Sequence, residues 1–122
     1  MSKKILLIDD EKDFTELTGT LLGFHDLDVM TVNDPVAVEA LLEAHDYALV
    51  VTDLMMPHLD GFDVIRKVRA KQKYADTPIM VLSAKALTDA ERKFLLQQKV
   101  HVLTKPFEPQ GLVEKITQLI GL

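Results

Sequence analysis

The chain has 122 residues, a length that suits one domain and excludes two of ordinary size. Its composition, 48% hydrophobic and 27% charged, is ordinary for a soluble protein. A formal net charge of -5 argues against a general nucleic-acid binder, and no stretch has the roughly 20 apolar residues of a membrane helix. The lack of cysteine excludes disulfides, thiolate chemistry and cysteine zinc sites.

The first predicted strand, residues 5–8, is apolar throughout and ends at Asp9 and Asp10. An apolar run this short is no signal peptide, so we expect a cytoplasmic protein. A helix follows the acidic pair and is expected to close at Gly23. Apolar residues recur in it at helical spacing: Phe14, Leu17 and Leu21.

The next strand, residues 28–32, alternates polar and apolar side chains, which is typical of an edge strand. Asp34 and Pro35 then start a second helix, because the aspartate caps free amides and the proline lacks an N–H that the first turn would leave unbonded. The central stretch is residues 49–57, an apolar run that indicates a strand buried on both faces and ending at Asp53. Open α/β sheets bind ligands outside such ends, so Asp53 is a candidate functional residue.

The third helix follows a loop at residues 57–61 and is marked by Phe62, Ile65 and Val68. Its basic continuation, residues 66–73, is interpreted as a solvated helix face, because cations suit the carboxyl end of a helix. We therefore do not interpret this run as a nucleic-acid contact.

The fourth strand, residues 78–82, ends at Ser83, and the fifth, residues 100–103, ends just before Lys105. Between them, residues 88–91 match a capping box that starts the fourth helix. A last amphipathic helix follows the fifth strand.

Five strands alternate with five helices, which predicts a single α/β domain over residues 1–122. We expect a doubly wound, five-stranded parallel sheet with strand order 2-1-3-4-5, whose switch point lies between the first and third strands. Asp9, Asp10 and Asp53 end those two strands, so all three are expected in one crevice.

Three carboxylates in one crevice repel each other by on the order of 3 kcal/mol per pair, at about 5 Å and an effective dielectric of about 20. A hard cation offsets this repulsion, and Mg²⁺ prefers carboxylate, water and phosphate oxygens. Ser83 and Lys105, at two further strand ends, add a hydroxyl and a cation. A nucleophilic carboxylate, a metal, a hydroxyl and a cation form a set suited to phosphoryl transfer.

Over its full length the chain resembles the receiver domains of bacterial two-component response regulators, with a layout similar to the chemotaxis regulators. The motifs that carry the resemblance are Asp9-Asp10, Asp53 with Met56-Pro57 and Asp60-Gly61, Ser83-Ala84, and Thr104-Lys105-Pro106-Phe107. The resemblance implies a flavodoxin-like (βα)5 fold and a cis peptide before Pro106.

The resemblance also implies that Asp53 is the phospho-acceptor, that Ser83 bonds the phosphoryl group and that Lys105 pairs with it. Phosphate would come from the phosphohistidine of a histidine kinase or histidine phosphotransfer protein and would later hydrolyse in place. The domain would therefore catalyse only its own phosphotransfer and dephosphorylation and would otherwise not be an enzyme. The implied Mg²⁺ ligands are Asp9, Asp10, Asp53 and the backbone carbonyl of Met55.

Phosphorylation is expected to move Ser83 and its loop, and so to change the face made by the fourth helix, the fifth strand and the last helix. An unidentified downstream protein or output domain would bind there. We expect a monomer or weak homodimer with no membrane contact and no direct nucleic-acid contact. Since nothing follows the last helix, we expect a stand-alone receiver or one excised from a longer regulator or hybrid kinase.

Two positions, Val102 and Gln98, differ from the usual pattern of the family, and the role of a third, Lys85, is open. Val102 stands where an aromatic residue usually relays the signal, so we expect output through loop and backbone shifts. No glycine ends the fourth helix near Gln98, so either one residue there is strained or the helix frays. Lys85 is expected to be solvated or to contact the phosphoryl group.

Three alternative functions compete with this one. A degenerate receiver would act only as a protein-binding module, although the complete set of acids, hydroxyl and lysine argues against it. An electron carrier of the same topology would need a loop that cradles phosphate, where Asp9 and Asp10 instead repel it. A metal-dependent phosphohydrolase would need pocket residues or a base that the sequence does not offer.

Overall fold

A computed structural model describes residues 4–57 and 59–121. Residues 1–3, part of the N-terminal segment considered above, lie outside the described residues. The five strands are β1 (Lys4–Ile8), β2 (Asp28–Val32), β3 (Leu49–Asp53), β4 (Ile79–Ser83) and β5 (Val100–Thr104).

The helices alternate with these strands along the chain. They are α1 (Lys12–Phe24), α2 (Val38–Ala44), α3 (Gly61–Arg69), α4 (Asp89–Gln97) and α5 (Pro109–Ile120), with short 3-10 turns at Pro35–Ala37 and Gln72–Tyr74. Among the described residues, no helix is long and apolar enough to cross a membrane.

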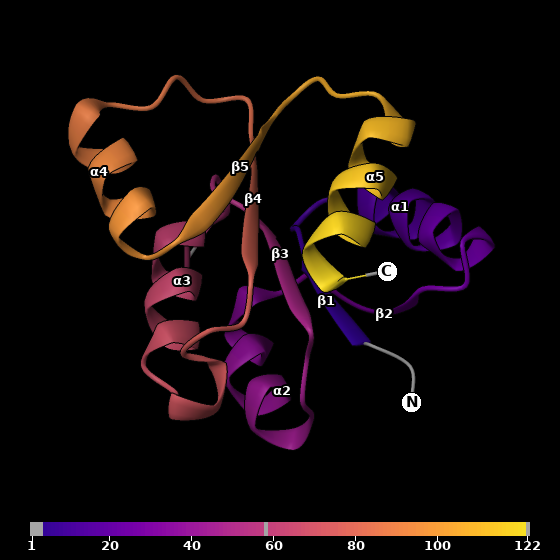
Figure 1. Cartoon of the computed structure of the whole chain (residues 1–122), viewed down its shortest axis with the longest axis horizontal. Helices are drawn as coiled ribbons and strands as arrows, with labels where there is room; N and C mark the ends of the chain where they lie inside the picture. Colours follow the sequence, from indigo (N-terminus) through magenta and orange to yellow (C-terminus); the bar gives the residue numbers. More distant parts are fainter. Residues whose placement is uncertain (1–3, 58, 122) are drawn as a thin grey trace.

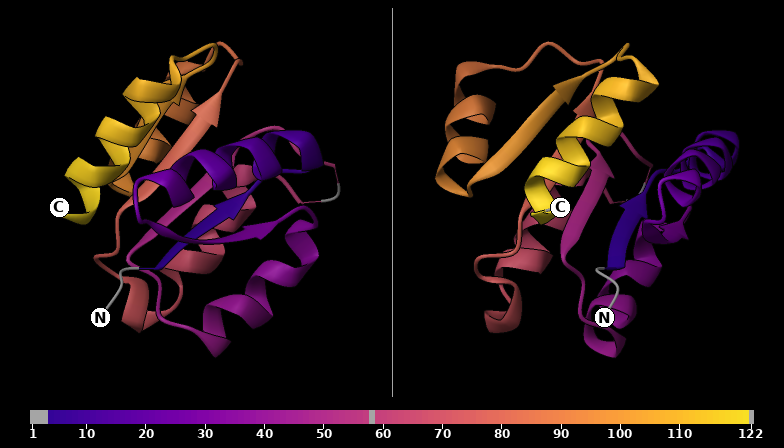
Figure 2. Two further views of the ribbon diagram at one scale, coloured as in Figure 1. Left: turned by 90° about the vertical axis from the view of Figure 1, so that its right-hand side faces the viewer. Right: turned by 45° about the vertical axis from the view of Figure 1, so that its right-hand side comes forward.

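All five strands are parallel, and their order β2-β1-β3-β4-β5 confirms the predicted doubly wound sheet. β2 lies at one edge of the sheet, as its alternating sequence predicted. Ile8 pairs with Thr52, and Asp53 with Leu82, so the carboxyl ends of β1, β3 and β4 lie side by side. All strands run toward this same edge of the sheet (Figure 2).

Helices cover both faces of the sheet. α1 and α5 pack on one face and α2, α3 and α4 on the other (Figure 1). The apolar residues of β1, β3 and β4 alternate between the two cores, which explains why their sequences are apolar without interruption. The central strands of the sheet are therefore apolar on both faces, and their carboxyl ends carry Asp53 and Ser83.

The predicted start of α4 is confirmed, whereas Asp34 and Pro35 start the 3-10 turn Pro35–Ala37 that leads into α2 at Val38, and one predicted helix end is wrong. Asp34 accepts a hydrogen bond from the Val36 N–H, and Thr88 and Glu91 form the expected capping box. Gly23 does not close α1, which continues to Phe24; the chain turns instead at Asp26, whose φ is 59°. Small polar residues such as aspartate tolerate this left-handed conformation better than most residues do.

The end of α4 shows which of the two alternatives near Gln98, a strained residue or a frayed helix, the chain adopts. Lys99 has a φ of 58°, so a single non-glycine residue takes the left-handed conformation between α4 and β5. The α4 ladder continues to this point through the bond from the Gln98 N–H to the Phe94 carbonyl, so the helix does not fray into β5.

The basic run at residues 66–73, which covers the end of α3 and the residues after it, makes ion pairs and hydrogen bonds with neighbouring elements. Lys71 pairs with Glu39 and Glu43 of α2 at 3.0 and 3.1 Å. The Arg69 guanidinium donates to three backbone carbonyls, those of Gln98, Tyr74 and Thr77. Arg69 and Lys71 are partly buried by these contacts, so the interpretation of the run as a solvated helix face is wrong for these two residues, which hold α3 to its neighbours.

Candidate functional site

Three acidic residues converge where β1 and β3 end. Asp9 and Asp10 follow β1 directly, and Asp53 is the last residue of β3. Each offers one carboxylate oxygen, and these atoms lie within 4.8 Å of one another. Asp9 is 0% exposed and Asp53 7%, so two of the three charges are held out of water.

Lys105 reaches the same cluster from the end of β5. Its Nζ lies 3.3 Å from Asp53 Oδ2 and 3.6 Å from Asp9 Oδ2. Its backbone N–H donates to the Ser83 carbonyl at 2.8 Å, which joins the loops after β4 and β5. The Lys105–Pro106 peptide bond is cis, as the family resemblance implied.

Backbone contacts orient the Asp53 carboxylate. The Met55 N–H donates to Oδ1 at 3.2 Å, while Lys105 faces Oδ2. The chain then turns back so that Gly61, the first residue of α3, lies against the Asp53 backbone; its N–H donates to the Leu54 carbonyl at 3.0 Å. Gly61 was predicted from the sequence as a loop residue and as part of the family motif, although a glycine between a strand and a helix also signals close backbone approach.

Ser83 ends β4 next to the cluster and is 2% exposed. Its hydroxyl accepts a hydrogen bond from the Lys85 N–H at 3.0 Å. The Lys85 ammonium pairs with Glu91 of α4 at 2.7 Å, and its side chain is 30% exposed, so the lysine is paired as well as partly solvated. This ion pair between the loop after β4 and the first turn of α4 was not predicted from the sequence.

Burial dominates the electrostatics of Asp9. It raises the pKa of this carboxyl to about 6, although the Glu11 N–H and Lys105 act to lower it; Asp53 and Asp10 raise it further. Within the described residues, Asp9 Oδ2 is buried and has no hydrogen-bond partner. Such an oxygen is expected to take a ligand, because an unpaired buried polar atom costs free energy.

The donor set fits a hard divalent cation. Asp9, Asp10 and Asp53 supply carboxylate oxygens only, which are ligands that Mg²⁺ prefers, and a cation would offset their mutual repulsion. The observation of this structure that supports the fit is the buried Asp9 Oδ2, which has no hydrogen-bond partner among the described residues and only a 3.6 Å ion-pair contact with Lys105.

Asp9→Asn is expected to raise the free energy of unfolding at pH 7, without divalent cations, by on the order of 2 kcal/mol. The folded protein holds the Asp9 proton with a pKa of about 6 instead of 3.8. Because the folded state binds the proton more tightly than the unfolded chain, stability falls as the pH rises through this range, and the full penalty remains above it.

Urea denaturation at pH 4 and pH 7 measures this effect. The stability difference between Asp9→Asn and wild type should be large at pH 7 and shrink toward pH 4. Asp13→Asn, an exposed aspartate four residues away, is the control and should show no comparable change. The same Asp9→Asn difference at both pH values would contradict the prediction.

Comparison with known proteins yields one family. A model described as the response regulator receiver domain matches residues 5–117. The chain is 35% identical over 119 residues to the transcriptional regulatory protein CpxR homolog of Haemophilus influenzae, covering 96% of this chain and 50% of that protein. It is also 35% identical over 123 residues to a chemotaxis protein CheY homolog of Campylobacter jejuni, covering 97% of this chain and 92% of that protein.

A solved structure gives the same comparison in three dimensions. The receiver domain of a sensor histidine kinase from Pseudomonas aeruginosa is 28% identical, with a TM-score of 0.85 and complete coverage of both chains. That structure has a magnesium ion coordinated in its active-site cleft. The present chain spans half the length of the Haemophilus relative and nearly all of the Campylobacter relative.

Proposed function

The chain belongs to the response regulator receiver domain family, and we propose that Asp53 accepts a phosphoryl group from a histidine kinase or a histidine phosphotransfer protein. The observation that carries the proposal is the setting of the Asp53 carboxylate. One oxygen is held by the Met55 N–H and the other faces Lys105, inside an acidic cluster suited to Mg²⁺. A cation and a bound divalent metal beside the accepting group are features that stabilise phosphoryl transfer.

The transfer step exchanges one bond to phosphorus for another. A carboxylate oxygen of Asp53 attacks the phosphorus atom and the P–N bond to the donor histidine breaks with its electron pair on that nitrogen; the donor ring, protonated at its other nitrogen, leaves as neutral histidine. Lys105 supplies positive charge beside the new acyl phosphate, 3.3 Å from Asp53 Oδ2 before transfer. Mg²⁺, held by Asp9, Asp10, Asp53 and the Met55 carbonyl, would neutralise charge on the phosphoryl oxygens. Water later attacks phosphorus and restores the free carboxylate.

The reaction is tested by incubating the purified chain with ³²P-labelled acetyl phosphate, with and without Mg²⁺. The expected result is Mg²⁺-dependent uptake that hydroxylamine removes, because hydroxylamine cleaves acyl phosphates. Label that resists hydroxylamine would indicate a phosphoester on a hydroxyl residue and would contradict the proposal. Absence of uptake would also contradict it and would favour a receiver that only binds proteins.

The signal is proposed to leave the site through Ser83, Lys85 and Glu91. The Ser83 hydroxyl bonds the Lys85 N–H, and the Lys85 ammonium bonds Glu91, whose carboxylate also accepts the Thr88 N–H at 2.9 Å. The hydrogen bond from Lys85 lowers the pKa of the Glu91 carboxyl, so the pair stays charged. A phosphoryl group that draws Ser83 toward Asp53 therefore pulls on the start of α4.

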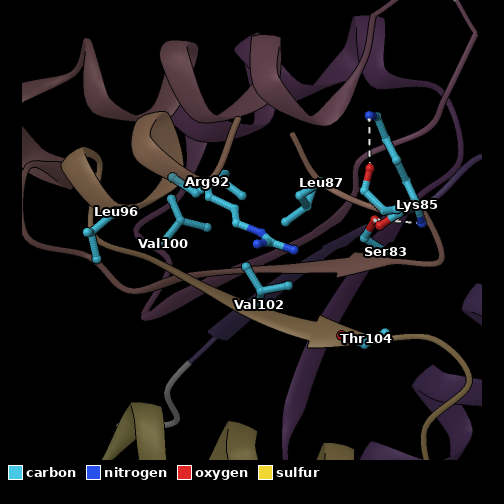
Figure 3. Close-up of a pocket in the computed structure, with 10 residues that line it drawn as sticks. Ser83, Lys85, Leu87, Arg92, Leu96, Val100, Val102 and Thr104 are labelled. Carbon is cyan, nitrogen blue, oxygen red and sulfur yellow. Dashed lines mark hydrogen bonds between the residues drawn. The ribbon is translucent and has the colours of Figure 1, made fainter. Parts of the chain in front are cut away.

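Val102 leaves room for this movement. It is 40% exposed on β5 and lines a groove of about 490 Å³ between β5 and α4. Figure 3 shows Val102 directed into this groove, with Arg92 and Leu87 opposite and Ser83 and Lys85 at one end. We infer that the face formed by α4, β5 and α5 changes through the loop after β4 and presents this altered groove to a downstream protein or output domain.

Glu91→Gln is expected to weaken this relay while leaving the site intact. Glutamine keeps an oxygen for the Thr88 N–H but loses the charge that holds Lys85. After addition of Mg²⁺ and beryllofluoride, a phosphate mimic, amide resonances near Asp53 should shift as in wild type, whereas those of residues 88–91 should shift by about half as much or less, because one charged contact is lost.

Asp89→Asn is the matched control, since it removes a carboxylate from the same first turn of α4. It should leave the α4 shifts unchanged. Full α4 shifts in Glu91→Gln would exclude the Lys85–Glu91 pair as the relay.

The remaining parts of the proposal concern partners and location. A cytoplasmic protein fits the absence of cysteine, which is compatible with a reducing compartment. We propose that the domain works as a monomer or weak homodimer and binds neither membrane nor nucleic acid directly.

A further inference from the structure

Lys105 contacts an aromatic ring as well as two carboxylates. Its Nζ lies 4.8 Å from the centroid of the Phe14 ring, in addition to its contacts with Asp53 and Asp9. A lysine ammonium within about 6 Å of a ring centroid, over its face, is attracted by the negative face of the ring. The ammonium is thus held by groups from α1 and from two strand ends.

The Phe14 ring is fixed independently of the lysine. It meets Phe107 edge to face, with centroids 6.2 Å apart and an angle of 82° between the ring planes. Both rings are half-buried and pack against the core between the sheet and the helices α1 and α5. Because packing determines where the ring lies, the ring can act as a fixed support for a mobile cation.

The Lys105 side chain is flexible, and its ion pairs alone do not fix the position of its ammonium. Its ammonium ends a flexible four-carbon stem, its side chain is 21% exposed, and the hydrogen bond to Asp53 is long, at 3.3 Å. Two carboxylates lie at similar distances, so the ion pairs alone do not select one position. An aliphatic residue at position 14 would fill similar space without attracting the ammonium.

We propose that Phe14 is a positioning residue for phosphoryl transfer, because its ring holds the Lys105 ammonium beside the carboxylate that accepts the phosphoryl group. This inference rests on the proposed function of Asp53. Phe14 acts through Lys105, so its effect depends on the lysine and on the ring, not on bulk.

The first test compares phosphorylation rates with acetyl phosphate at saturating Mg²⁺, which avoids any effect on the docking of a protein donor. Phe14→Leu should lower the rate by about fivefold, whereas Phe14→Tyr, which keeps the ring, should stay within about twofold of wild type. Phe24→Leu is the matched control, because Phe24 lies on the same helix and is 81% exposed; its rate should not change. In a Lys105→Ala background, Phe14→Leu should cause no further loss.

The second test does not require phosphorylation. The Lys105 ε-methylene protons, assigned by comparison with Lys105→Ala, should show an upfield ring-current shift in wild type and in Phe14→Tyr, and should lose it in Phe14→Leu. Unchanged ε-methylene resonances in Phe14→Leu would overturn the proposal, as would equal rate losses in the leucine and tyrosine variants or an undiminished loss without Lys105. If no variant takes up phosphate, the proposed function fails, while a shift lost only in Phe14→Leu still assigns Phe14 as the support of Lys105.

Discussion

Asp53→Asn is expected to lower phosphate uptake by roughly 10³-fold or more, to background, because the amide oxygen carries no charge and is a poor nucleophile. The substitution keeps the shape of the side chain, and the Met55 N–H still finds an oxygen to bond. It also relieves repulsion within the acidic cluster, so the protein should remain folded. Labelling with acetyl phosphate, followed by peptide mapping, measures the loss.

Asp10→Asn separates the role of the nucleophile from that of the charge. It removes one carboxylate from the same cluster, so it should weaken cation binding and slow the reaction at low Mg²⁺. Raising the Mg²⁺ concentration should restore its rate, because the nucleophile is intact. The proposal would be wrong if excess Mg²⁺ also restored labelling of Asp53→Asn, or if the label mapped to Ser83.

The sheet order and the meeting of the acids could be predicted from the sequence because both follow from local patterns and chain topology. Apolar runs of strand length identify the buried strands, and right-handed crossovers limit how they can be ordered. Once the order is set, the ends of β1 and β3 must be neighbours. Asp9, Asp10 and Asp53 are therefore brought together by topology, without any knowledge of side-chain contacts.

The contacts that refine the site could not be predicted in this way because they depend on loop paths. The Lys85–Glu91 ion pair forms across the turn before α4 and carries no periodic signal. Phe14 was identified only as one of the apolar residues at helical spacing in α1, because this spacing does not reveal a cation above the ring. Asp26 was missed because a left-handed residue other than glycine is uncommon.

Gly61→Ala is expected to lower the free energy of unfolding by about 2 to 4 kcal/mol, because a Cβ at this position has no room. It would lie 2.4 Å from the Asp53 carbonyl oxygen and 2.7 Å from the Leu54 Cα, so backbone would have to move. Equilibrium unfolding in urea measures the loss. Gly111→Ala is the matched control, since a Cβ there meets nothing within 4 Å inside α5, and a helical alanine should stabilise by roughly 0.5 to 1 kcal/mol.

Gly61→Ala is also expected to slow phosphate uptake, because the backbone oxygen with which the new Cβ clashes belongs to Asp53, the proposed phospho-acceptor. Relief of the clash moves either α3 or the end of β3, and the second movement changes the 3.3 Å contact between Asp53 and Lys105. Folded Gly61→Ala should therefore take up phosphate at least about tenfold more slowly than Gly111→Ala, since misplacing a reacting group is costly. Equal stability and equal rates in the two variants would show that the approach of Gly61 to Asp53 does not constrain the site.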